Sequence, residues 1–135
     1  MPDYIPFELP IQVTASDIDA MNHVNNVAFL RFVQDAAAAH WLSLASPELH
    51  ASVAWVVRKH EIEYLRPGKP EDHLIARTWV GEPSAATWDR FTEIVRRDDG
   101  QLLVTARTVW VLIDRQTGRP RRVDARITEA FHRPG

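Results

Sequence analysis

The amino-acid sequence predicts an α+β fold in which a five-stranded antiparallel sheet wraps around one long central helix. Residues 27–43 form a long helical pattern, one strand-like segment precedes it, and four follow it. No insert of helix size separates the four later segments, so we expect consecutive strands to be antiparallel neighbours. A chain of 135 residues has the usual size of one domain, and we treat residues 1–135 as a single domain.

The first strand is predicted over residues 7–13, where apolar side chains recur with a period of two. Pro10 lacks a backbone N–H, which favours an edge or bulged strand. Residues 16–26 then contain three asparagines and two aspartates, residue types that favour turns and helix caps. We therefore expect a polar loop that leads into the helix.

The helix predicted over residues 27–43 is apolar on nearly every side. Its polar stripe consists of Arg31, Gln34 and Asp35. A helix with so narrow a polar face is expected to be surrounded by other structure. At 1.5 Å per residue it would be roughly 25 Å long, which suits a helix lying across a sheet.

The four later strands are predicted from segments rich in Val, Ile, Trp and Thr, namely residues 53–65, 74–80, 87–96 and 102–113. The dipeptide Asp99-Gly100 is a strong hairpin signal between the last two. We expect a turn at Pro47 and a short helix over residues 124–131. The tryptophans of these strands are expected to pack in the core or an interface, and Trp41 in an interface.

The composition excludes several classes of function. Charged residues make up 25% of the chain and the formal net charge is -2, which gives no electrostatic basis for binding nucleic acid. The absence of cysteine excludes disulfides, thiolate nucleophiles and Cys-ligated zinc, and it favours the cytoplasm. Residues 1–6 show no secretion signal and no segment is long enough to cross a bilayer, so we expect no membrane partner.

The chemistry is predicted to lie in residues 17–26, where carboxylates, amides and an imidazole directly precede a helix N-terminus. Unpaired backbone N–H groups and the positive end of the helix dipole favour a developing oxyanion there. A carboxylate beside them could attack a carbonyl carbon or activate a water molecule, with His23 or the asparagines orienting either partner.

Residues 16–30 read SDIDAMNHVNNVAFL and resemble the signature of hotdog-fold thioesterases related to 4-hydroxybenzoyl-CoA thioesterase, especially the branch with the motif D-x-D-x-x-G-H-V-N-N. Plant acyl-ACP thioesterases are similar over the same stretch. Residues 57–67 and 108–120 resemble the second strand and the last strand with its exit turn. The sequence departs from the motif at Asn22, which stands where relatives have Gly, and Asn tolerates left-handed geometry better than most residues.

The resemblance implies a hotdog-fold acyl-CoA thioesterase that needs no cofactor, with Asp19 as the catalytic carboxylate, acting as nucleophile or general base. His23 matches a functional histidine of the plant enzymes and is assigned with Asn25 to the catalytic residues. Asn26 is assigned to substrate binding. For both asparagines, helix capping is the alternative to positioning a carbonyl or water. Asp17 is expected to hold the loop.

Arg119, Arg121 and Arg122 are assigned to binding the phosphates of coenzyme A, and a solvated basic turn is the alternative. No second His or Glu has ligand spacing near Asp17 and Asp19, so we expect no metal site. The resemblance further implies a homodimer whose two central helices lie side by side beneath a joined sheet, with two active sites at the interface. Two such dimers could form a tetramer.

Three other functions stay open at this point. An acyl-ACP thioesterase would need a basic patch for the acidic carrier protein, and the overall charge gives it little support. A noncatalytic acyl-CoA-binding hotdog module would bind the same ligand without cleaving it. A hotdog dehydratase or hydratase usually takes its His and carboxylate from a different motif.

Overall fold

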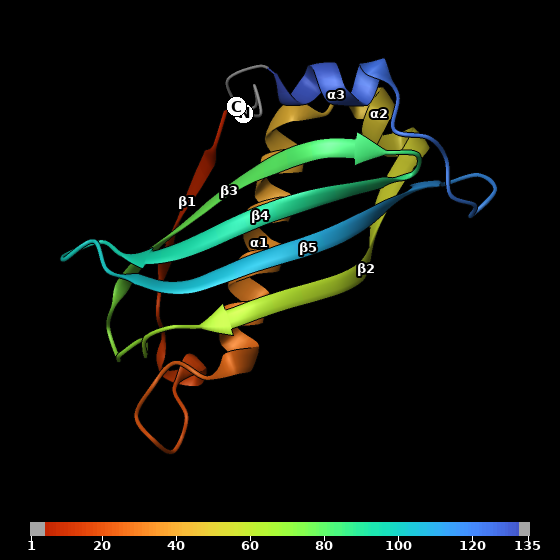
Figure 1. Ribbon diagram of the computed structural model, residues 1–135. Coiled ribbons are helices and arrows are strands. Elements are labelled where there is room, and N and C mark those ends of the chain that lie inside the picture. Colours follow the sequence, from red (N-terminus) through yellow and green to blue (C-terminus); the bar gives the residue numbers. More distant parts are fainter. Residues whose placement is uncertain (1–4, 133–135) are drawn as a thin grey trace.

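The computed structural model describes residues 5–132, which form one antiparallel sheet folded around a long helix (Figure 1). The strands are β1 (Phe7–Gln12), β2 (Val53–Tyr64), β3 (His73–Ser84), β4 (Thr87–Arg96) and β5 (Leu102–Asp114). The helices are α1 (Asn26–Leu44), α2 (Pro47–Ser52) and α3 (Ala125–Phe131), with a 3-10 turn at Ala15–Asp17. The predicted α+β fold with five antiparallel strands and one long helix is confirmed.

The sheet has the order β1-β3-β4-β5-β2, and every pairing is antiparallel. Consecutive strands are neighbours in the pairs β3–β4 and β4–β5, and Gly100 supplies the left-handed residue of the second hairpin with φ 70. The expectation is wrong for β2 and β3, because β2 lies at the far edge beside β5. Residues 65–72 connect them, and this connection is longer than a hairpin loop and passes the N-terminal end of α1.

Two other differences concern the ends of elements. The turn expected at Pro47 is the short helix α2, in which Pro47 occupies the first turn and the Ser46 side chain accepts a hydrogen bond from the N–H of Leu49. Strand β3 continues four residues beyond the predicted end at Val80, across a register shift between Val80 and Pro83. Both features lie at the end of the molecule where α1 finishes.

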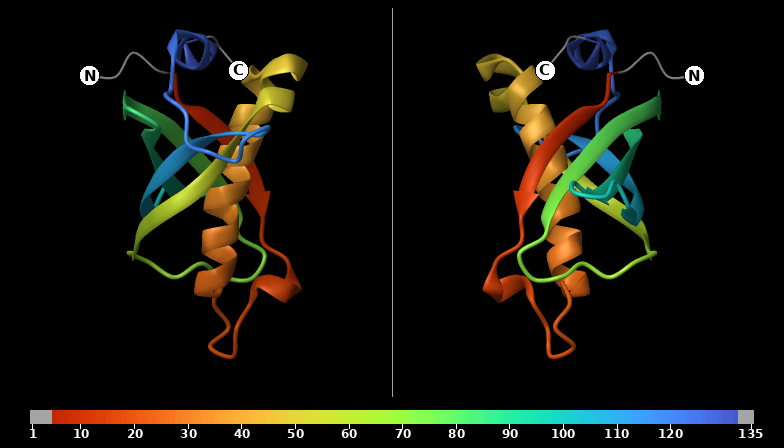
Figure 2. Two further views of the ribbon diagram at one scale, coloured as in Figure 1. Left: turned by 90° about the vertical axis from the view of Figure 1, so that its right-hand side faces the viewer. Right: turned by 90° about the vertical axis from the view of Figure 1, so that its left-hand side faces the viewer.

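The core lies between the inner face of the sheet and one side of α1 (Figure 2). Phe29, Phe32, Val33 and Ala36 are buried against sheet residues such as Leu74, Ile94, Leu103 and Val104. The opposite side of the helix is open in the single chain, where Val27 is 75% exposed and Leu42 70% exposed. The helix therefore has more apolar surface than one chain covers.

Candidate active site

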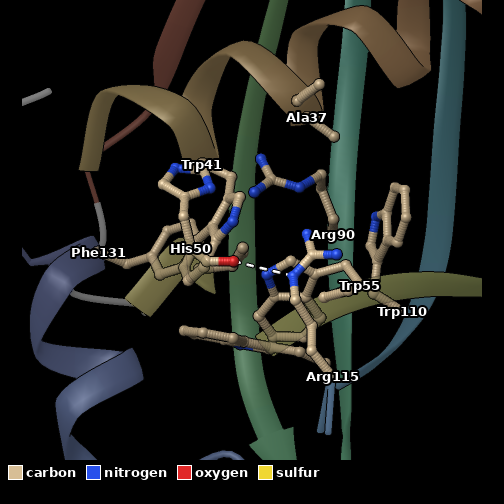
Figure 3. Close-up of a pocket in the computed structure, with 12 residues that line it drawn as sticks. Ala37, Trp41, His50, Trp55, Arg90, Trp110, Arg115 and Phe131 are labelled. Carbon is tan, nitrogen blue, oxygen red and sulfur yellow. Dashed lines mark hydrogen bonds between the residues drawn. The ribbon is translucent and has the colours of Figure 1, made fainter. Parts of the chain in front are cut away.

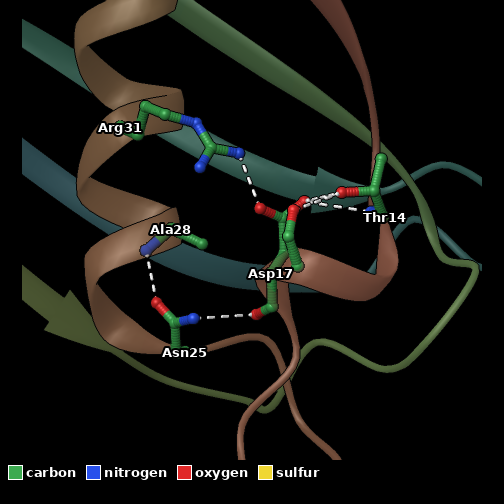
Figure 4. A network of polar contacts seen from close by, with 6 residues as sticks. Thr14, Asp17, Asn25, Ala28 and Arg31 are labelled. Atoms are coloured by element: carbon green, nitrogen blue, oxygen red, sulfur yellow. Dashed lines mark hydrogen bonds and ion pairs between the residues drawn. The ribbon is translucent and has the colours of Figure 1, made fainter.

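The loop before α1 is held in place by Asp17, which is only 1% exposed (Figure 4). Its Oδ2 accepts hydrogen bonds from the Thr14 N–H at 2.9 Å and the Thr14 hydroxyl at 3.2 Å. Its Oδ1 accepts one from Nη2 of Arg31 at 2.7 Å. Burial alone would raise the pKa of Asp17, but these bonds outweigh it and hold the pKa below its usual value. Asp17 thus has the loop-holding role that the sequence predicts.

Asn25 is the cap of α1. Its Oδ1 accepts a hydrogen bond from the Ala28 N–H at 2.6 Å, and its Nδ2 donates to the carbonyl oxygen of Asp17 at 3.1 Å. The expectation that one of the two asparagines caps the helix is confirmed. Both ends of the Asn25 amide are engaged in this way, and its catalytic assignment stays a prediction.

Asp19 lies in a tight turn that projects from the loop. Its Oδ1 accepts hydrogen bonds from the N–H groups of Met21 at 2.9 Å and His23 at 3.2 Å. Asn22 has a φ of 61, so the left-handed position that relatives fill with Gly is filled here by Asn. The other carboxylate oxygen of Asp19 makes no hydrogen bond within residues 5–132. Because the Asp19 side chain is exposed, this oxygen is free to react with a bound substrate or a water molecule.

A cavity of about 210 Å³ brings three of the assigned residues together, namely Asp19, His23 and Asn26. Its far wall is the segment that leaves β2, including Tyr64 and Arg66. The sequence reasoning assigned no role to these two residues, although the segment belongs to the stretch that resembles the family. Arg66 adds a cationic side chain to the lining of this cavity, which suits a site that binds anionic or polarised groups.

The first turn of α1 supplies backbone donors at this cavity. The Ala28 N–H is capped by Asn25, and the Phe29 N–H binds the Asn25 carbonyl oxygen at 3.2 Å. The N–H groups of Asn26 and Val27 have no acceptor within the described part of the chain. Because they stand at the positive end of the helix dipole, they are suited to binding a carbonyl oxygen that gains negative charge.

The connection after β2 is fixed against the same loop by Gly68. The Val24 N–H donates to the Gly68 carbonyl oxygen at 2.8 Å. A Cβ added at Gly68 would lie 2.7 Å from Cγ2 of Val24, closer than side chains tolerate. A larger residue at position 68 would therefore force Val24 and Phe29, which both line the cavity, to shift.

The three arginines assigned to coenzyme A do not join this cavity within one chain. They follow β5, where Arg121 lies 3.8 Å from Asp114 and 3.5 Å from Asp124. The Asp114 N–H donates to the carbonyl oxygen of Arg119. This turn and the loop before α1 stand at opposite corners of the molecule (Figure 1). The phosphate-binding assignment of Arg119, Arg121 and Arg122 stays a prediction.

No group of three or more His, Asp or Glu side chains within residues 5–132 is arranged to hold a metal ion. None of the described helices combines the length and apolar character needed to cross a membrane.

The family model of the thioesterase-like superfamily matches residues 13–131, which is most of the chain. The chain belongs to this superfamily. A curated relative is the acyl-CoA thioester hydrolase YbgC of Escherichia coli, which is 27% identical and aligns over 93% of this chain and 95% of the relative.

Solved structures with the same fold include a 1,4-dihydroxy-2-naphthoyl-CoA thioesterase from Synechocystis, with a TM-score of 0.81 and 22% identity over 93% of this chain and 95% of that one. A variant of 4-hydroxybenzoyl-CoA thioesterase in complex with 4-hydroxybenzoyl-CoA has a TM-score of 0.83 and 14% identity over 93% and 98% of the two chains. These similarities confirm the hotdog fold of this member of the superfamily.

Proposed function

We propose that this chain hydrolyses acyl-CoA thioesters to the free acid and coenzyme A. The observation that carries the proposal is the Asp19 carboxylate, which lines a cavity at the start of α1 and keeps one oxygen free of hydrogen bonds to residues 5–132. Membership of the thioesterase-like superfamily and the similarity to an acyl-CoA thioester hydrolase support the same reaction. The cytoplasmic location stays a prediction from the sequence.

In this mechanism the thioester carbonyl lies in the cavity with its oxygen toward the N–H groups of Asn26 and Val27. Two routes lead to the products. Oδ2 of Asp19 either attacks the carbonyl carbon, forming an anhydride that water then hydrolyses, or removes a proton from a water molecule that attacks instead. In both, the C–S bond breaks and coenzyme A leaves as the thiolate, which takes a proton from the protonated Asp19 in the second route and from water in the first. The backbone donors stabilise the oxyanion of the tetrahedral intermediate.

His23 and Asn26 have supporting roles in this proposal, as residues that line the cavity beside Asp19. The backbone N–H of His23 holds Oδ1 of Asp19, which directs the free oxygen of the carboxylate away from the turn. In this proposal the imidazole orients the attacking water or the thioester. The side chain of Asn26 donates a hydrogen bond to the substrate.

We further propose that two copies pair through the free edge of β2. Strand β2 is an edge of the sheet and is 12 residues long, and an unpaired edge of that length is a ready template for a second strand. The exposed apolar side chains Val27, Leu42 and Val56 would be covered by a neighbouring copy. Pairing about a two-fold axis is antiparallel, so the start of one β2 meets the end of the other.

This pairing gives the arginines a place at the active site. The turn after β5 is attached to the start of β2, because the Arg115 N–H donates to the Ser52 carbonyl oxygen. The end of β2, at Tyr64, lines the Asp19 cavity. In an antiparallel pair, Arg119, Arg121 and Arg122 of one copy therefore approach the cavity of the other, where they would meet the phosphates of coenzyme A. A tetramer of two such dimers remains a prediction.

The test is thiol release, followed with a thiol-reactive dye, from short, long, branched and aromatic acyl-CoAs. Turnover of any of these supports the proposal and identifies the substrate class. Saturable binding without turnover across the panel contradicts it and leaves a binding module. The same acyl groups are also tested on acyl-carrier protein. Turnover of these thioesters alone would keep the proposed chemistry of Asp19 but make the carrier-protein thioester, not acyl-CoA, the substrate.

A further inference from the structure

A second cavity, of about 240 Å³, lies at the other end of α1, where the helix meets α2 and α3 (Figure 3). Four of the five tryptophans line it together with Phe131. Its helix residues are Ala37, Ala38 and Trp41, whereas the Asp19 cavity uses Asn26 and Phe29. From Asn26 to Ala38 the helix advances roughly 18 Å, so the two cavities of one chain are separate.

The charge in this second cavity comes from Arg90 of β4, which is only 4% exposed. Its Nη1 donates to Nδ1 of His40 at 3.0 Å and to Oγ1 of Thr78 at 2.9 Å. Burial lowers the pKa of Arg90 to about 9, so the guanidinium is still positive at neutral pH. Burial, with the charge of Arg90, lowers the pKa of His40 to about 3, and this neighbour is therefore neutral.

No carboxylate balances this charge within residues 5–132. Arg90 forms no ion pair with a described residue, and no Asp or Glu lines the cavity. Its neutral contacts are the two hydrogen bonds and the Phe131 ring, whose centre lies 5.7 Å from the guanidinium carbon. Burying a cation without an anion is costly, so the site is electrostatically suited to receive one.

Further groups on the same walls have unused hydrogen-bonding capacity. Nε1 of Trp110 and Nε2 of His50 are buried, and neither has a partner in the described part of the chain. The indole nitrogen can act only as a donor. At the exposed rim lies a second cation, Arg115, whose Nε is held by the carbonyl oxygens of His50 and Val53, each at 2.9 Å. A negatively charged acceptor in this cavity would find an unused donor on Trp110 in addition to the cation of Arg90.

We propose that this cavity is a binding site for a small organic acid, whose carboxylate pairs with Arg90 and whose aromatic or apolar body lies among the tryptophan rings. The acid can come from two sources. It is either a free carboxylic acid or a second acidic group on the acyl part of a thioester held by the partner chain. Binding of a small acid does not depend on the proposed hydrolysis. The second source, an acyl group on a bound thioester, rests on the proposed function.

The binding test uses the quenching of tryptophan fluorescence by benzoate, phenylacetate and hexanoate, each compared with its neutral amide. At least one acid should bind saturably, and its amide should bind about tenfold more weakly or worse, because the amide cannot form the charge-assisted pair. The same loss is expected for the acid with Arg90→Met. The exposed-site control Arg97→Met and the active-site variant Asp19→Ala should bind as the parent does.

If Arg90→Met does not fold, the comparison of acid and amide on the unaltered protein still decides the test. Trp110→Phe then serves as the second variant, because it removes one hydrogen-bond donor of the cavity and keeps an aromatic ring. The proposal is overturned if none of the three acids binds, or if acid and amide bind equally. It is also overturned if Asp19→Ala changes the binding and Arg90→Met does not, because the acid then occupies the thioester site.

The source is identified by comparing the hydrolysis of benzoyl-CoA with that of the mono-CoA thioester of terephthalic acid. If Arg90→Met lowers kcat/KM about tenfold or more for the carboxylated thioester alone, the acyl group is the source of the acid. If Arg90→Met loses acid binding but hydrolyses both thioesters at the parent's rate, the source is a free acid. Failure of all hydrolysis leaves the binding result to stand alone, so the two proposals fail separately.

Discussion

Replacing Asp17 by Ala should lower the free energy of unfolding by about 2–4 kcal/mol. The substitution removes two hydrogen bonds from Thr14 to a buried carboxylate and the ion pair with Arg31. Most of the loss comes from the Thr14 bonds, because the Arg31 side chain is 54% exposed and the pair is worth about 0.2–1 kcal/mol in water. The Thr14 N–H also loses its acceptor.

The assay is urea unfolding followed by tryptophan fluorescence at one protein concentration, since association with a second copy would shift the midpoint. The matched control is Asp98→Ala, an exposed aspartate of the β4–β5 hairpin, which should change the stability by less than about 0.5 kcal/mol. A cost for Asp17→Ala no larger than that of the control would refute the assignment of Asp17 as the residue that holds the loop.

The same substitution has a pH signature. The pKa of Asp17 is lower in the folded protein than its ordinary value of 3.8, so near that pH the unfolded chain binds more protons and stability rises with pH. The contribution is complete above 3.8 and is lost as the pH falls through the folded pKa. The stability difference between the parent and Asp17→Ala should therefore shrink below pH 3.8, and a difference that grows on acidification would contradict the sign.

Three further predictions concern the cap, the connection and the assembly. Asn25→Ala should lower the free energy of unfolding by about 1 kcal/mol, because the Ala28 N–H loses its cap, and Asn25→Asp should restore most of it in the same urea assay. Gly68→Ala should destabilise the protein by about 1–3 kcal/mol and lower kcat/KM, because its Cβ meets Val24 at the cavity wall, whereas Gly81→Ala, with 3.2 Å to the edge of the Phe91 ring, should cost less. Sedimentation equilibrium should give twice the chain mass of 15.4 kDa, or four times for paired dimers, and a species of 15.4 kDa at micromolar concentration would exclude the shared site.

Local patterns in the sequence predicted most of the fold because they depend on near neighbours. Alternation over residues 7–13 predicted β1, and Asp99-Gly100 predicted the last hairpin. The asparagines before α1 predicted a capped helix start, and Asn22 has the left-handed geometry that its position required. The sheet order could not be predicted in this way, because it depends on how residues 65–72 pass the end of α1.

The residues of the candidate site also differ in whether neighbouring sequence could predict them. Asp19, His23 and Asn26 are close in sequence and share one cavity, so a single motif could indicate them. Tyr64 and Arg66 reach that cavity only because β2 ends beside the loop. The walls of the Arg90 cavity come from three helices and four strands, and the pattern of the tryptophan-rich strands did not indicate that their rings would surround a cation. Sequence reasoning assigned those rings to packing because a strand pattern does not report a space between elements.

The most direct test of the central claim is the rate of thiol release by Asp19→Asn on the best acyl-CoA of the panel. Asparagine keeps an oxygen to accept the bonds from Met21 and His23 but removes the reactive charge, so the turn should hold. We predict unchanged unfolding stability and a fall in kcat of about 10²-fold or more, with Asp98→Asn as the active control. A folded Asp19→Asn protein that retains the parent's kcat would contradict the account.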